Sequence, residues 1–177
     1  MPVSPDTDNL YIGKGALYFT PDGGSEEHMG NAVSIEVGSE IEELEHFSSL
    51  SGVRSKDLVV VLSQSYTFTV QLEELTRQNV QRKLLGSTPA LNTAGNYEFG
   101  IGASTKITGA LRFAGANTYG NKFNIDCPNV QIRPGGTGIQ LISNEFGVVE
   151  LVIEALYSEA NGNFGTVEIL ESETPSS

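Results

Sequence analysis

The sequence predicts a mainly β fold in which one short α-helix packs beside a mostly antiparallel sheet. Alternation of apolar and polar residues recurs along the chain, which is typical of half-buried antiparallel strands. Only residues 76–86 have the spacing and end signals of a helix. Twenty glycines in 177 residues indicate many turns. No segment has the composition of a linker, so we expect a single domain over residues 1–177.

The clearest strand spans residues 66–72, where Tyr66, Phe68, Val70 and Leu72 alternate with polar side chains. The apolar, β-branched run 58–62 precedes it. Residues 105–113 also alternate, and residues 148–156 are apolar except for two glutamates. Shorter strands are predicted at residues 15–20, 97–101, 122–127, 130–133, 138–142 and 165–170.

The predicted helix has a signal at each end. Thr76 can cap the amino end by accepting a hydrogen bond from a backbone N–H that would otherwise be unpaired. Val80 and Leu84 are four residues apart and share a face. Gly86 can end the helix in left-handed geometry.

Residues 33–42 predict a strand with an acidic face. One face carries Val33, Ile35, Val37 and Ile41, and the other carries Ser34, Glu36, Glu40 and Glu42. The adjacent pair Glu42-Glu43 shifts the phase, and a bulge there would return Leu44 to the apolar face. The competing interpretation is a helical turn, because Ile41, Leu44 and Phe47 recur every three residues. We predict the strand.

The charge of the chain excludes some classes of function. The net charge is −12, which disfavours a protein that grips nucleic acid by neutralising phosphates. No apolar run approaches the roughly 18 residues of a membrane span, and the first residues lack the features of a secretory signal. The lone Cys127 suits a reducing compartment. We therefore expect a soluble protein made inside a cell, without a membrane partner.

The residues needed for catalysis are scarce. The chain has two histidines and one cysteine, with no pair at metal-ligand spacing. No GxSxG, HExxH, P-loop or GxGxxG motif occurs. Cys127 is most simply a small buried hydrophobe. We therefore expect no enzyme activity, no cofactor and no metal.

Four stretches together resemble the major tail tube proteins of long-tailed, siphovirus-like bacteriophages. They are residues 13–19 (GKGALYF), 35–61 (IEVGSEIEELEHFSSLSGVRSKDLVVV), 72–76 (LEELT) and 121–167, which runs from NKFNIDCPNV to NGNFGTV. Residues 87–104 match least well. The order and spacing of the stretches carry the resemblance over nearly the whole chain.

The resemblance implies a structural virion protein with a β-sandwich or barrel subunit and a flanking helix. Six copies would close into a ring, and rings would stack into a hollow tail tube whose inner wall is a continuous β-barrel conducting double-stranded DNA. Residues 41–61 would form a long projecting hairpin, residues 1–12 an N-terminal arm and residues 171–177 a flexible C-terminal tail. The implied partners are further copies of the chain and the tail terminator, tape measure and baseplate or tip proteins. The chain would be synthesised in the host bacterial cytoplasm.

Two sets of residues are predicted to act in such a tube. The lumen would be lined by Glu36, Glu40, Glu42 and Glu45. Six copies carry a formal −72, so an acidic wall would repel the duplex and let it slide. The hairpin would contact the next ring through Phe47, Leu50, Val53, Arg54, Lys56 and Asp57.

Two alternatives remain open. The tube of a contractile tail, a tailocin or a secretion needle would share the fold. A carbohydrate-binding jelly-roll module is more distant, because it would need exposed aromatic side chains on a concave face. The chain has no tryptophan, and Tyr66 and Phe68 fall on the apolar face of their strand.

Overall fold

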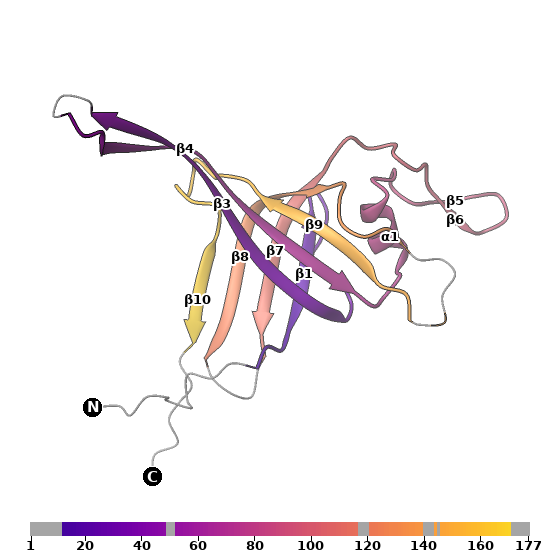
Figure 1. The fold of residues 1–177 in the computed structure, drawn as a ribbon. Coiled ribbons are helices and arrows are strands. Elements are labelled where there is room, and N and C mark those ends of the chain that lie inside the picture. Colours follow the sequence, from indigo (N-terminus) through magenta and orange to yellow (C-terminus); the bar gives the residue numbers. More distant parts are fainter. Residues whose placement is uncertain (1–11, 49–51, 117–120, 140–143, 145, 171–177) are drawn as a thin grey trace, which may run out of the picture.

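The computed structural model describes residues 12–48, 52–116, 121–139, 144 and 146–170 (Figure 1). Its strands are β1 (Gly15–Pro21), β2 (Glu27–His28), β3 (Ala32–Ser48), β4 (Ser55–Leu72), β5 (Ala90–Leu91), β6 (Tyr97–Glu98), β7 (Ile107–Gly115), β8 (Lys122–Arg133), β9 (Val149–Ala155) and β10 (Thr166–Leu170). The helix α1 spans Arg77–Lys83. The predicted mainly β class is confirmed. The expected N-terminal arm (apart from Ile12) and C-terminal tail lie outside the described residues.

The strands form one eight-stranded antiparallel sheet and one small two-stranded sheet. The large sheet runs in the order β2-β1-β7-β8-β9-β4-β3, and β10 joins it at β8. On the edge of β8 away from β7, residues 130–133 pair with β9 and residues 122–126 pair with β10. The sheet therefore divides at β8, and β9, β4 and β3 cross in front of β8, β7 and β1 (Figure 1).

The hydrophobic core lies between these two parts of the sheet. Alternate residues of the strands on both sides point into it, as the period-two patterns of residues 66–72 and 148–156 predict. Its buried members include Leu17, Phe19, Met29, Phe68, Val70, Leu72, Leu111, Val130, Ile132, Val149, Leu151 and Ile153. The core is thus built almost entirely by strands.

Several predicted strand boundaries differ from the structure. The predicted strands 122–127 and 130–133 are one strand, β8, and Pro128 lies within it. The β7–β8 register shifts beside Pro128, which lets the sheet tolerate a residue without an N–H. Cys127 is buried as predicted. The strand predicted at residues 97–101 ends at Glu98, and the one predicted at 138–142 lies largely outside the described residues.

The helix begins as predicted and ends differently. The Thr76 hydroxyl accepts a hydrogen bond from the Asn79 N–H at 3.2 Å, which confirms the cap. At the other end Leu85, not Gly86, has a left-handed φ of 47°. Gly86 is required for space instead, since a Cβ there would lie 2.3 Å from the Phe99 ring. Packing against Phe99 therefore explains the glycine.

Residues 33–42 form a strand, as predicted, but its apolar face has a different member at its start. The β3–β4 register shifts between Ala32 and Ser34, so that Ala32 packs against the core and Val33 is 54% exposed. Ile35 packs on the core as expected. The bulge at Val33 thus places Ala32, instead of Val33, on the core side of the sheet.

Candidate functional site: an assembly surface on the hairpin

The β3–β4 hairpin extends well beyond the rest of the sheet (Figure 1). Strand β9 pairs only with Tyr66–Leu72 of β4, whereas the β3–β4 ladder continues to the pair Ser48–Ser55. Residues 40–64, here named the hairpin arm, therefore pair only with each other among the described residues. A two-stranded ribbon of this kind is at best marginally stable in water, and the described residues provide no further strand to support it.

The hairpin arm exposes an unusual amount of apolar surface. Large hydrophobic side chains are exposed on both of its strands and at its tip: Ile41, Leu44, Phe47, Val53, Leu58, Val59, Val60, Val61 and Leu62. Scattered exposed hydrophobics are normal, but a contiguous group of this kind marks an interaction site. The arm is therefore a candidate surface for assembly.

Three of the four predicted lumen residues share one face. Glu36 pairs in register with Thr69, Glu40 with Ser65 and Glu42 with Ser63, on the side of the sheet away from the core. We name Glu36, Glu40 and Glu42 the acidic face. Glu42 accepts a hydrogen bond from Ser63 at 3.1 Å, and none of the three forms an ion pair with a described residue. At a rise of about 3.4 Å per residue, Glu40 and Glu42 are about 7 Å apart, close enough to repel at physiological salt.

The acids of the neighbouring strand β9 are held by the protein itself. Glu154 pairs with Arg133. Glu150 accepts hydrogen bonds from the Thr137 N–H at 3.0 Å and from Gln71, and these bonds, chiefly that from the Thr137 backbone, lower the pKa of its carboxyl. Unlike these two acids of β9, Glu36, Glu40 and Glu42 have neither an ion pair nor a backbone hydrogen-bond donor among the described residues.

Glu45 is separated from the acidic face. Between the pairs Glu42–Ser63 and Glu43–Val61, strand β4 contains the extra residue Leu62. The predicted bulge is thus present, but its extra residue lies in β4. Successive side chains of β3 therefore continue to point to alternate faces through the bulge. Leu44 then stays on the face of Glu42, contrary to the expectation that it rejoins the apolar face. Glu45 lies on the opposite face and pairs with Lys56.

The predicted contact residues at the hairpin tip differ in their surroundings. Phe47 and Val53 are exposed, and Leu50 lies outside the described residues. Lys56 and Asp57 are engaged within the hairpin, the first with Glu45 and the second with His46 Nδ1 at 2.6 Å. Arg54 forms no ion pair within the described part of the chain, so it is the tip cation best placed to meet a partner.

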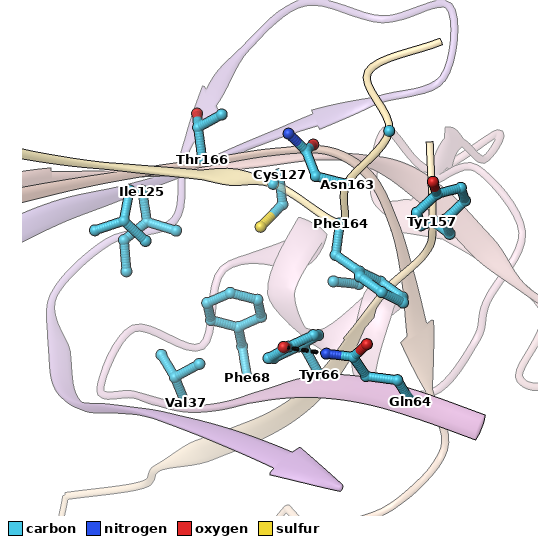
Figure 2. A pocket seen from close by; sticks show the side chains of 14 residues that line it. Val37, Gln64, Tyr66, Phe68, Ile125, Cys127, Tyr157, Asn163, Phe164 and Thr166 are labelled. Atoms are coloured by element: carbon cyan, nitrogen blue, oxygen red, sulfur yellow. Dashed lines mark hydrogen bonds between the residues drawn. The ribbon is translucent and has the colours of Figure 1, made fainter. Parts of the chain in front are cut away.

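The sequence did not predict a hollow of about 440 Å³ beside the base of the hairpin (Figure 2). It lies between β4 with Val37 of β3 on one side and β8, β10 and the loop before β10 on the other. The lining is largely apolar: Val37, Tyr66, Phe68, Ile125, Cys127, Ala155, Tyr157, Phe164 and Val167 contribute to it. Tyr157 and Phe164, which flank the turn Asn161-Gly162-Asn163, are the signal that could have indicated it.

Three further observations concern reactivity, metal binding and membrane spans. Burial raises the pKa of the Cys127 thiol to about 11, which leaves it protonated and unreactive at neutral pH. Within the described ranges, no group of three His, Cys, Asp or Glu side chains could hold a metal ion. Over the same ranges, no helix is long and apolar enough to cross a membrane.

Comparison with known proteins gives one family. No curated protein matches the chain. A family model described as "Protein of unknown function UCP028589" matches residues 10–98, which include β1, the complete β3–β4 hairpin and α1. The match covers half of the chain, and the chain therefore belongs to the family of proteins of unknown function UCP028589.

Proposed function

We propose that this chain is the structural subunit of a hollow tube: six copies close into a ring, rings stack, and double-stranded DNA passes through the lumen. The tube is that of a long, non-contractile bacteriophage tail, and the chain performs no reaction. This proposal joins the family resemblance of the sequence to the surface of the hairpin. The β-sandwich or barrel character of the subunit in that assembly is part of the proposal.

The observation that carries the proposal is the hairpin arm. Its two strands expose large apolar side chains and have no third strand beside them among the described residues. Such a ribbon is costly in a free monomer, because it combines unpaired strand edges with apolar surface in water. Repeated contact between identical copies would cover both, and closing a barrel across subunits would remove the free edges.

The acidic face supports the second part of the proposal. Glu36, Glu40 and Glu42 stand among Ser and Thr side chains on the side of the sheet away from the core, without described cationic partners. A wall of hydroxyl and carboxylate groups is water-wetted and repels a duplex that carries one negative charge per roughly 1.7 Å. In a tube with this face inward, DNA would slide and would not adhere.

Electron microscopy of the concentrated, purified chain in negative stain tests the proposal. Hollow rods with a regular axial repeat and a central channel are the expected result. Because assembly can depend on an initiator, the same observation is made after adding preformed tail-tip complexes of a matching phage. Uniform small particles under both conditions, or solid fibres without a channel, would contradict the tube.

A further inference from the structure

The hollow has features of a site for a polypeptide. Its lining includes Val37 of β3 and Thr166 and Val167 of β10, and each of these two strands has only one strand neighbour among the described residues, β4 and β8 respectively. An occupant that is itself a chain could bury apolar side chains in the hollow and also meet these unpaired strand edges. A small apolar molecule could do only the first.

A buried acceptor in the wall also lacks a donor. The Asn163 side-chain oxygen is buried and accepts no hydrogen bond from any described residue. Asn163 lies beside Cys127 and Phe164 in the wall of the hollow (Figure 2). Buried acceptors in folded proteins are almost always paired, so the unpaired oxygen indicates a missing donor. Because this oxygen is already buried in the single chain, the Asn163 side chain would have to turn for a backbone N–H of an inserted segment to reach it.

The tip of the hairpin arm matches such a site. Phe47 and Val53 present apolar side chains there, and Val53 is 75% exposed. Arg54 next to it has no described ion partner. The segment that frames the hollow, residues 157–170, carries Glu159 and Glu168 and no Lys or Arg. Apolar fit and opposite charge therefore agree.

We infer that the hollow lined by Phe68, Ile125, Cys127, Phe164 and Val167 is the socket that receives the hairpin tip of a second copy of this chain. The inference rests on the proposed tube, in which the second copy belongs to the next ring. The contact is heterologous: the tip of one copy meets the hollow of another, so each copy gives one contact and receives one. Contacts of this type propagate along a stack of rings.

Disulfide trapping tests the socket. In a Cys127→Ala background, Val53→Cys at the tip is combined with Val167→Cys at the mouth of the hollow; both positions are exposed, so the fold tolerates the changes. A disulfide forms only when the two Cα atoms come within about 7 Å. The matched control combines Val53→Cys with Ile101→Cys, which is 76% exposed in the loop before β7 and does not line the hollow. Each sample is oxidised, run on a non-reducing gel and imaged for rods.

The expected result is a ladder of covalent oligomers for the 53/167 chain and essentially monomer for the 53/101 chain. Rods without a 53/167 ladder, or equal ladders in both chains, would contradict the socket but not the proposed tube. Absence of rods would contradict the tube. The gel would still test the socket in that case: a ladder in the 53/167 chain alone would support the socket, and no such ladder would contradict it.

Discussion

At the scale of residues, polar side chains under the helix connect it to the sheet. Asn79 is 1% exposed, and its side-chain N–H groups donate to the Met29 carbonyl at 2.8 Å and the Glu74 carbonyl at 3.0 Å. Arg82 pairs with Glu27 over the ring of Phe19, and burial lowers the pKa of its guanidinium. Sequence patterns cannot predict such a network, because both residue types are usually exposed on a helix.

We predict that Asn79→Ala destabilises the fold by about 2–3 kcal/mol. The substitution leaves the buried Met29 carbonyl without its side-chain donor, and such losses cost about 1–3 kcal/mol each. Urea unfolding measures the change, with Gln78→Ala on the same helix as the control, expected within about 0.5 kcal/mol. Equal, small effects of the two substitutions would contradict the structural role of Asn79.

A pH-dependent contribution is expected from Glu150. The hydrogen bonds of Thr137 and Gln71 favour its ionised form and lower its pKa below the ordinary 4.5. Its stabilising effect is therefore complete above pH 4.5 and is lost as the pH falls through the lowered pKa. Urea unfolding should show Glu150→Gln less stable than the wild type at pH 7, with the difference shrinking towards pH 3. Glu36→Gln, whose carboxylate accepts no hydrogen bond from a described residue, is the control. A difference that does not change with pH would contradict this account.

At the scale of elements, the sequence predicts strands well where one face is buried and less well elsewhere. Period-two alternation correctly places residues 66–72 and 148–156, because burial on one face forces that pattern. The bulge at Val33 depends on pairing between strands, and so does the finding that the predicted bulge at Glu42-Glu43 has its extra residue, Leu62, in β4; both therefore lie beyond a reading of β3 alone. The acidic face was predicted for the same reason as the strands, whereas the hollow joins β3, β4, β8 and β10 and needs the tertiary fold.

Shortening the hairpin tests whether its tip is needed for the proposed stacking of rings but not for folding of the subunit. We predict that replacing residues 48–55 with Asn-Gly, a two-residue turn that suits the antiparallel pair Phe47–Lys56, leaves a folded subunit that forms no long rods. The physical reason is that the core lies at the other end of β4 and loses nothing, while the tip contact is removed. Circular dichroism and electron microscopy measure the two effects. The control replaces residues 92–96, the connection between β5 and β6, with Asn-Gly between the pair Leu91–Tyr97. Full-length rods from both chains would contradict a role for the tip.

At the scale of the whole molecule, charge is unevenly distributed along the chain. Residues 1–50 carry −9, residues 51–133 carry +4 and residues 134–177 carry −7. In the proposed tube, the acidic hairpin strand and the basic middle of the chain would be complementary between copies, which would favour one orientation of assembly. In the same proposal, the excess negative charge that remains would keep a duplex from adhering.

Reversing the acidic face should change DNA passage without abolishing assembly. We predict that Glu36→Lys, Glu40→Lys and Glu42→Lys together yield rods that retain double-stranded DNA at low salt, whereas wild-type rods do not. Cosedimentation of rods with labelled duplex measures retention, and raising the salt concentration should release the DNA. The control reverses Glu98, which lies in β6 of the small sheet, off the acidic face and away from the hollow. If rods of the triple variant retain no more DNA than wild-type rods, the result would contradict a lumenal position for these residues.

The most direct test of the account is a side-chain-resolution cryo-electron microscopy reconstruction of the assembled rods. The prediction is a stack of rings of identical copies around an open channel, with the carboxylates of Glu36, Glu40 and Glu42 projecting into it. A reconstruction that places these three side chains on the outer surface, or that has no channel, would contradict it.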